Sequence, residues 1–394
     1  MLQLLLACTP AEPEAPLEQE KSEAEGHWVK LDTLAFGHKD HTATRLGEQI
    51  VVLGGFSDKV ERIDLGAEKV RAVASLPAPR MDHAAAGLPD GRLLVAGGTV
   101  YDRETRERTP SDSALIWDPE SDAWSEAPPM STVRTDFALV AVEGGVLAIG
   151  GLDAEGAVLG TTERFDGQAW TSGPAVTPRH GFDIDAYEGG WLITGGRNGN
   201  PVGLVEHLVG DEVRSLPALS PPRADHVLTV LSDGSLLVTG GDDGAAVIAD
   251  VDQFVDGAWF ARTPMSFPRA QHGAGQVEDG RVVVFGGRPV PDSPDALPVR
   301  EVEIYEADGA WRLANRQVQA RYEGVVHTLD DGRVMIVGGH SRGKVINEIS
   351  VYSSKPKPPR VKQPEDTAPP DPPDEDVVHP PEPPGGPPGL PPGI

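Results

Sequence analysis

The sequence of 394 residues contains a single cysteine, Cys8, so no disulfide can form within the chain and chemistry that needs two thiols is excluded. Aromatic residues make up only 5% of the chain, and no apolar run reaches the roughly 18 residues of a membrane-spanning helix. Lys and Arg number 34 against 61 Asp and Glu, which gives a net charge of −27. A chain without a basic stripe is unsuited to phosphate backbones, so nucleic acid is not an expected partner.

The acidity has two interpretations. It keeps the protein soluble, which is the favoured explanation, or it steers cationic ligands to the surface. No metal site and no cofactor are predicted, because the sequence contains no close pair of metal ligands and no cofactor-binding loop.

The segment Leu4-Leu5-Leu6-Ala7-Cys8 resembles the lipobox of bacterial lipoproteins, in which a small residue precedes a lipidated cysteine. Only seven residues precede Cys8 and none is basic, whereas a secretory signal has a charged start and a longer apolar stretch. Residues 1–8 therefore fit a truncated lipoprotein signal whose true start lies upstream, or the match is chance. The favoured interpretation predicts a lipid-anchored protein of the bacterial cell envelope, at a periplasmic or outer-membrane face; chance would leave it cytoplasmic.

Two further segments have the composition of disordered chain. Residues 9–26 carry six Glu and one Lys and predict an acidic tether. Residues 353–394 hold sixteen prolines and predict an extended spacer rich in polyproline II. A linker with no partner is the favoured function of this tail, and a ligand for a proline-recognition domain is the alternative.

Glycine pairs recur between these tails, each closing a short apolar run. Successive pairs lie 43 to 53 residues apart, a period that is typical of four-stranded propeller blades and too long for leucine-rich repeats. The seven pairs are Gly54 and Gly55, Gly97 and Gly98, Gly150 and Gly151, Gly195 and Gly196, Gly240 and Gly241, Gly286 and Gly287, and Gly338 and Gly339. We interpret these glycines as structural, since paired glycine lets a strand end turn sharply and lets neighbouring backbone approach.

One repeat, residues 79–130, shows the predicted strands. Residues 80–88 form a first strand, Asp90-Gly91 a tight turn, 92–96 a second strand, 114–119 a third and 123–126 a fourth. The last repeat lacks a fourth strand, and residues 27–31 look like a fourth strand without the preceding three. The sequence thus predicts an all-β, seven-bladed propeller over residues 27–352, whose last blade is completed by an N-terminal strand.

The repeat resembles the kelch repeat, whose pattern is a starting Arg, a strand-terminal Gly-Gly, an aromatic-Asp and a spaced Trp. Trp117 with Trp124 and Phe165 with Trp170 show the aromatic positions, and the repeats around Ile63 and Glu206 lack the Trp. The resemblance implies a protein-interaction module, with a sialate-mutarotase-like enzyme acting on carbohydrate as the alternative. A copper enzyme like galactose oxidase needs a cysteine inside the propeller, and Cys8 lies outside it.

First strands begin with a repeated arginine, and its side chain is expected at one mouth of the central channel. Ion pairing inside the fold is the favoured role, and a ligand-facing ring is the alternative. Six blades carry this arginine: Arg80, Arg134, Arg179, Arg223, Arg269 and Arg321. A recurring histidine, at His41, His83, His226 and His272, occurs once per blade and is not expected to bind metal.

Function is expected where the repeats differ, in the loops after the glycine pairs, two of which, 99–112 and 288–300, are long. Candidate ligand-binding residues near this mouth are His180, Arg197, Asn198, Asp242, Arg288, Tyr322, His340 and Arg342. Such side chains suit a sugar, a carboxylate or an acidic peptide. If the chain is an enzyme, Glu323 and His340 are the candidate acid and base. The partner is predicted to be a protein, peptide or glycan, and the chain a monomer with membrane contact through its lipid only.

Overall fold

The computed structural model describes residues 26–38, 40–291, 296–317 and 319–355. Cys8, nearly all of the predicted tether and the proline-rich tail after Lys355 lie outside the described residues, so their predicted roles stay predictions. Within the described ranges the regular structure consists of strands, and no helix there is long and apolar enough to cross a membrane.

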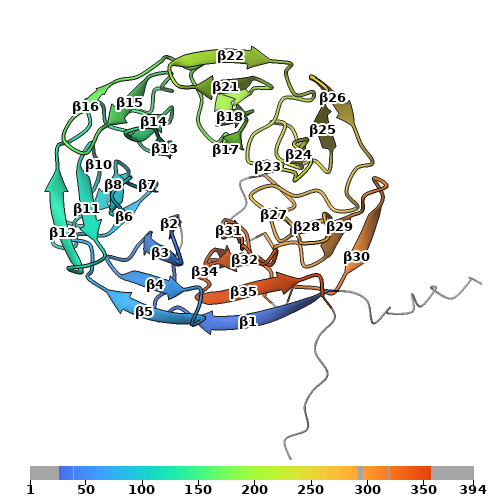
Figure 1. Cartoon of the computed structure of the whole chain (residues 1–394), viewed down its shortest axis with the longest axis horizontal. Coiled ribbons are helices and arrows are strands. Elements are labelled where there is room, and N and C mark those ends of the chain that lie inside the picture. The colour runs from blue at the N-terminus through green and yellow to red at the C-terminus, as the bar shows by residue number, and fades with distance from the viewer. Residues whose placement is uncertain (1–25, 39, 292–295, 318, 356–394) are drawn as a thin grey trace, which may run out of the picture. The chain divides into compact units, whose positions relative to one another are not determined.

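Seven four-stranded antiparallel sheets form a closed ring, as the sequence predicted, and each follows its neighbour around the ring in chain order (Figure 1). Blade 1 contains β2 (His41–Leu46), β3 (Gln49–Gly54), β4 (Val60–Asp64) and β5 (Lys69–Val73). Blade 2 contains β7 (Ala84–Gly87), β8 (Leu93–Ala96), β11 (Ala114–Asp118) and β12 (Ala123–Ala127). Blade 3 contains β13 (Ala138–Val142), β14 (Gly145–Ile149), β15 (Thr162–Phe165) and β16 (Trp170–Ser172). Blade 4 contains β17 (Asp183–Tyr187), β18 (Gly190–Thr194), β21 (Val205–Val209) and β22 (Glu212–Leu216).

The remaining blades keep the same order of strands. Blade 5 contains β23 (Val227–Val230), β24 (Leu236–Thr239), β25 (Val251–Val255) and β26 (Ala258–Ala261). Blade 6 contains β27 (Gly273–Gln276), β28 (Val282–Phe285), β29 (Val302–Tyr305) and β30 (Trp311–Ala314). Blade 7 contains β31 (Val325–Thr328), β32 (Val334–Val337), β35 (Glu348–Ser353) and, as its outermost strand, β1 (His27–Thr33).

The N-terminal strand closes the ring. β1 runs antiparallel to β35 with His27 opposite Ser353 and Thr33 opposite Glu348 (Figure 1). The Trp28 ring lies 4.9 Å from that of Phe285 and 5.4 Å from that of Tyr352, both edge-on. The two ends of the propeller therefore complete one blade together, which confirms the predicted closure.

The apolar core lies between the blades. Seven clusters of buried side chains each combine residues of two neighbouring blades, and together they cover all seven seams. Val51 and Leu53 of blade 1 meet Leu93 and Val95 of blade 2, for example, and all four side chains are fully buried. Since no blade buries its own faces alone, the blades are stable only as a closed ring.

The predicted first strand over residues 80–88 is wrong in one respect. It breaks at Asp82, which has φ of 53°, into β6 (Arg80–Met81) and β7. β6 pairs with β9 (Thr99–Tyr101), directly after the glycine pair, and not with β8. The left-handed residue turns the chain from one partner to the other, a change of direction that a pattern of apolar residues does not report.

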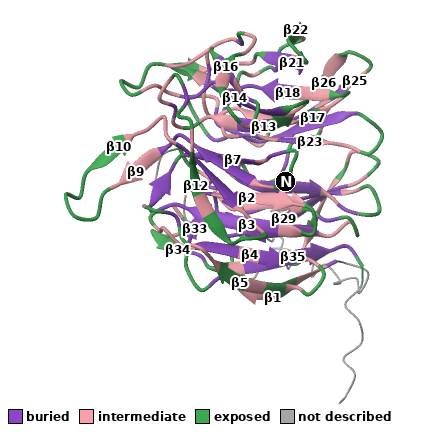
Figure 2. Cartoon of the chain, turned by 60° about the vertical axis from the view of Figure 1, so that its left-hand side comes forward, coloured by how far each residue is buried: buried purple, intermediate pink, exposed green. Residues whose placement is uncertain are grey.

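The long loop of blade 2 is also more regular than predicted. Residues 99–112 contain a hairpin of β9 and β10 (Arg108–Pro110), which stands away from the ring in Figure 2. Two further short hairpins follow the glycine pairs of blades 4 and 7. They consist of β19 (Arg197–Asn198) with β20 (Asn200–Pro201), and of β33 (His340–Ser341) with β34 (Lys344–Val345).

Deleting residues 27–32 removes the Trp28 packing and exposes the edge of β35, so the melting temperature should fall by roughly 10 °C or more. Thermal unfolding followed by circular dichroism measures the change. As a control, Val29→Ala alters a side chain of the same strand that is 43% exposed and should leave the melt nearly unchanged. An unchanged melt for the deletion would contradict closure by β1.

Candidate functional site

The segments after the glycine pairs gather at one end of the ring, which we call the post-glycine face. Each described first strand is preceded by a residue with positive φ, as Asp82 precedes β7, and we call this residue the left-handed residue of the blade. The residue after a glycine pair forms an antiparallel bridge to the residue that precedes the left-handed residue of the same blade. Arg197 bridges to His180 and His340 to Tyr322 in this way. The hairpin turns between first and second strands lie at the opposite end, the turn face, because the strands are antiparallel.

The left-handed residues themselves ring the axis at this face. In five blades the side chain is a carboxylate, and φ lies between 50° and 59° in all seven. Backbone bonds join neighbours, since the Gln271 N–H donates to Asp225 O (2.9 Å) and the Glu323 N–H to Gln271 O (3.1 Å). The seven residues are Asp40, Asp82, Asp136, Gly181, Asp225, Gln271 and Glu323.

Three predicted ligand residues, Arg197, Asp242 and Arg288, come together with Asp225 across blades 4, 5 and 6. Arg197 Nη2 lies 2.9 Å from Asp225 Oδ2 and 3.3 Å from Asp242 Oδ2. Arg288 Nη2 lies 3.2 Å from the same Asp225 oxygen. The arginines are thus held by carboxylates, and about a fifth of the Arg197 side chain stays exposed. The cluster can present guanidinium edges to an acidic ligand only in competition with these ion pairs.

Blade 7 brings a second group of candidates together. His340 Nδ1 lies 3.2 Å from Glu323 Oε2, and the Tyr322 and His340 rings are 3.9 Å apart. Both rings are buried, with 3% and 4% of each residue exposed, whereas Arg342 is exposed in the β33–β34 turn. Glu323 and His340 are therefore in contact, with the imidazole buried and 27% of the Glu323 side chain exposed.

The other two candidates lie in blade 4. His180 Nδ1 contacts Asp136 Oδ2 of blade 3 at 2.7 Å, and Asn198 is exposed in the β19–β20 hairpin. The structure thus places all eight candidates at the post-glycine face but splits them among three groups, in blades 3 to 4, 4 to 6 and 7.

The repeated arginines do not ring the mouth, so that prediction is wrong. Their guanidinium groups are buried inside their own blades. Arg134 Nη1 donates to the carbonyls of Gly150 and Thr161, both at 2.9 Å, while Nε and Nη2 bond Glu163. The favoured role, pairing within the fold, agrees with this geometry. The side chains that do ring the mouth follow two residues later, at the left-handed positions.

The recurring histidines pack in the seams. His226 Cε1 lies over Gly195 of the preceding blade, and Nε2 contacts Thr194 Oγ1 at 2.8 Å. Burial lowers the pKa of His41, His83 and His226 to about 3 and that of His272 well below its usual value. No group of three or more metal-ligating side chains occurs among the described residues.

Exposed apolar side chains at the post-glycine face are functional candidates that the sequence analysis did not identify. Phe36 is 36% exposed, Phe56 48% and Val345 42%. Arg108 lies over the Phe56 ring at 5.2 Å, and Lys59 lies 6.0 Å from that of Phe36. Phe56 was visible in the sequence, because it directly follows the first glycine pair.

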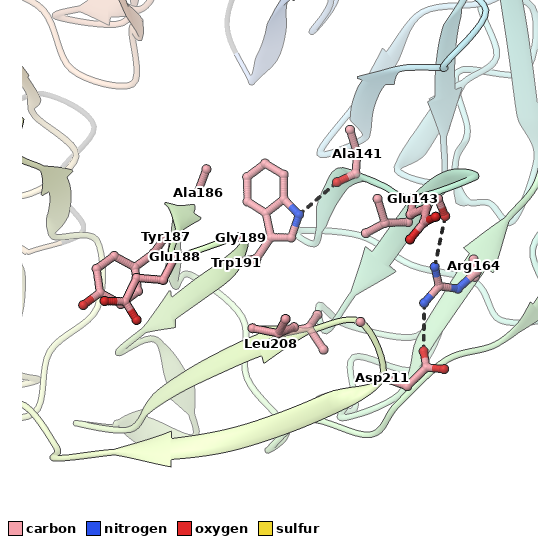
Figure 3. A pocket seen from close by; sticks show the side chains of 14 residues that line it. Ala141, Glu143, Arg164, Ala186, Tyr187, Glu188, Gly189, Trp191, Leu208 and Asp211 are labelled. Carbon is pink, nitrogen blue, oxygen red and sulfur yellow. Dashed lines mark hydrogen bonds and ion pairs between the residues drawn. The ribbon is translucent and has the colours of Figure 1, made fainter. Parts of the chain in front are cut away.

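A groove of about 970 Å³ lies on the turn face, between blades 3 and 4. Figure 3 shows Trp191 reaching Ala141, whose carbonyl accepts the indole N–H at 2.9 Å, and Arg164 held by Asp211 at 2.8 Å. Trp191 lies in β18, the second strand of blade 4, whereas the repeated tryptophans lie in fourth strands. This difference was visible in the sequence and could have indicated the groove. The groove lies at the end of the ring away from the predicted ligand residues.

A second cavity, of about 610 Å³, lies in the central channel between the inner strands of blades 4 to 7. The Asp183 carboxylate there accepts two backbone hydrogen bonds, from the N–H of Leu228 in blade 5 (2.7 Å) and from the N–H of Ile184, the next residue in the chain (2.9 Å). Burial raises its pKa to about 7. Asp183 therefore joins the inner strands of blades 4 and 5.

Comparison with known proteins matches residues 80–131 to the Kelch motif family. Kelch-like protein 34 of Homo sapiens is 28% identical over 271 residues, which are 64% of this chain and 41% of that protein. Kelch-like protein terF of Aspergillus terreus is 26% identical over 343 residues, with 73% of each chain covered. The chain spans 28% of Kelch repeat and BTB domain-containing protein 12 of Danio rerio, so it matches only a part of several relatives.

Two solved structures share the fold. YjhT superposes with a TM-score of 0.58 at 15% identity, over 72% of this chain and 99% of that one. A fungal alcohol oxidase in complex with copper gives 0.62 at 15% identity, over 84% and 76%. At such identity the likeness shows the fold alone.

Acid should destabilise the protein through the seam histidines. A free imidazole titrates near pH 6.5, whereas His226 titrates near 3 in the fold, so its stabilising effect is complete above 6.5 and is lost as the pH falls toward 3. One such group lowers the free energy of unfolding by about 2 kcal/mol between pH 7 and 5. His226→Phe, the residue type found at Phe137 and Phe182, should reduce that loss in urea unfolding. An identical pH dependence in the variant and wild type would refute this assignment.

Proposed function

We propose, from the kelch-repeat family that the motif match and the relatives support, that this propeller is a non-enzymatic binding module that engages a protein partner at its post-glycine face. The repeated residues are occupied within the fold, whereas the residues that differ between blades collect at this end. A rigid ring that presents variable segments on one face is well suited to recognition.

The observation that carries the proposal is the exposed apolar group of blades 7 and 1. Phe36, Phe56 and Val345 keep more than a third of their surface in contact with water. Val290 and Leu297 of blade 6 are also exposed at this face, at 43% and 53%. Aromatic side chains and arginine are enriched at the energetic centre of protein interfaces.

The charge cluster supplies a second element of recognition. Arg197 and Arg288 share the Asp225 carboxylate, so an acidic side chain of a partner can replace one of these ion pairs. Such a replacement of one ion pair by another fixes the orientation of the bound protein and disfavours basic ligands, and it adds less to the affinity. The expected partner surface therefore combines an apolar centre with an acidic edge.

Lipid attachment at Cys8, and with it a location in the cell envelope, is part of the proposal. His27 pairs with Ser353 at the turn face, since Tyr352 lies opposite Val334 at the start of β32. The chain therefore enters the propeller at the turn face, at the opposite end from the post-glycine face.

A carbohydrate-acting enzyme is the alternative. Its support is the Glu323 and His340 contact of 3.2 Å, the geometry of an acid and base pair. The burial of His340 disfavours it, because a sugar has to reach both groups. Acceleration of sugar anomer exchange by the purified protein, measured by NMR, would favour this alternative.

Peptide and glycan arrays test the proposal with two double variants. Phe36→Ala with Phe56→Ala removes the apolar centre, and Arg197→Ala with Arg288→Ala removes the cations. Each should weaken binding of an acidic, aromatic-rich peptide by about tenfold or more, because truncation at the centre of an interface costs the most.

The control is Arg92→Ala with Arg214→Ala, which removes the same charge from exposed positions away from the post-glycine face. It should bind as wild type does, and all variants are checked by thermal unfolding. Equal binding by wild type and both test variants would exclude the post-glycine face.

A further inference from the structure

In five blades a carboxylate from the third strand occupies the slot beside the side chain that begins the first strand, which is an arginine in blades 3 to 6 and His38 in blade 1. In blade 3, Glu163 bonds Arg134 and accepts the Ser131 N–H at 2.6 Å. In blade 6, Glu303 bonds Arg269 at 2.7 Å and accepts the Ser266 N–H at 2.6 Å. Glu61, Glu206 and Asp252 occupy the slot in blades 1, 4 and 5. In blades 3 to 6 the carboxylate neutralises a buried arginine, and in blade 7 Ser350 and Glu348 contact Arg321.

Blade 2 lacks both partners of this arrangement. Leu115 precedes Trp117 by two residues, as Glu163 precedes Phe165, and pairs with Val95 at the matching register. Pro77 precedes Arg80 by three residues, as Ser131 precedes Arg134, and proline has no N–H to donate. The slot is therefore apolar where the other blades place an acid.

Arg80 consequently bonds neutral groups. Nη1 donates to the carbonyls of Gly97 (2.6 Å) and Ser113 (3.0 Å), and Nη2 to Ser113 Oγ (2.7 Å). Within the described residues it forms no ion pair, and burial lowers its pKa to about 10. A buried guanidinium without a counter-charge is costly, so an anion beside it would be bound favourably.

A cavity of about 590 Å³ adjoins Arg80. Pro77, Val100 and Leu115 give it apolar walls, and Ser111 and Thr109 add hydroxyl groups. One wall belongs to the projecting β9–β10 hairpin seen in Figure 2. Arg80 keeps 5% of its surface exposed, whereas the other five arginines keep 0% or 1%. Glu126, which is exposed to solvent, also lines the cavity, and its carboxylate repels anionic ligands, most strongly those with more than one negative charge.

We propose that this cavity binds a small carboxylic acid with an apolar body, whose carboxylate takes the place of the acid that blade 2 lacks. The carboxylate would accept hydrogen bonds from the Arg80 guanidinium, and the apolar body would contact Pro77, Val100 and Leu115. The volume lies within the range of small-molecule sites. The cavity lies beside the β9–β10 hairpin, and its lining does not include Phe56, Arg197 or Arg288 of the proposed partner surface, so either proposal can fail without the other.

Isothermal titration of the full chain with octanoate tests the proposal, with octanamide as the neutral probe of the same shape. Octanoate should bind at least about tenfold more tightly than octanamide, because a bond between two charged groups exceeds a neutral one. Leu115→Glu restores the acid found in the other blades and should abolish octanoate binding by occupying Arg80 from within. Leu115→Gln, a neutral side chain of the same size, should retain it.

Arg80→Gln removes the guanidinium itself and should also abolish octanoate binding, so it tests the proposal if Leu115→Glu does not fold. A peptide that ends in Leu-Leu, compared with its C-terminal amide, separates a peptide carboxylate from a free organic acid as the source. Absence of octanoate binding to wild type at millimolar concentration would overturn the proposal. So would equal affinity for octanoate in wild type, Leu115→Glu and Arg80→Gln.

Discussion

The propeller depends on a contact in six of its seven seams, where a flat side-chain ring from the next blade lies over the first glycine of the pair; at Gly286 the Arg321 carbonyl of the next blade approaches instead. His83 lies over Gly54, Phe137 over Gly97 and His226 over Gly195, where a Cβ on the glycine would overlap the ring. These glycines also have positive φ, which disfavours any other residue. The contact lets the second strand end beside the left-handed turn of the neighbouring blade, and it holds six of the seven apolar seams together.

The contact also explains which residues are available for function. In most blades the repeated arginine, the third-strand carboxylate and the ring over the glycine all bind groups within the fold, so these side chains carry little information about a ligand. Positions at which one blade differs from the repeat carry more. Leu115 in place of an acid leaves Arg80 without an ion pair among the described residues, and Phe56 directly after a glycine pair exposes an aromatic ring at the surface. Each departure is a single change in an otherwise uniform repeat.

Much of the fold could be predicted from the sequence because its signal is repeated seven times. The glycine pairs mark the ends of second strands, and the missing fourth strand of the last repeat predicts the role of β1. The break at Asp82 could not be predicted, since it depends on a bridge to residues after the glycine pair, nor could the position of Arg134 inside its blade instead of at the mouth. The grouping of Arg197 with Arg288 requires knowing how far each blade rotates relative to the next.

A single pair of substitutions in blade 4 tests the seam contact most directly. A Cβ on Gly195 would overlap Arg223 O and lie 2.5 Å from His226 Cε1, both in the next blade, whereas Gly199, also at positive φ, has open space around it. Gly199→Ala should lower the free energy of unfolding by about 1 kcal/mol through backbone strain alone, and Gly195→Ala by about 3 kcal/mol or more. Urea unfolding measures both values. Equal losses would contradict the account, because the close approach of the next blade to the glycine would then contribute nothing to holding the blades together.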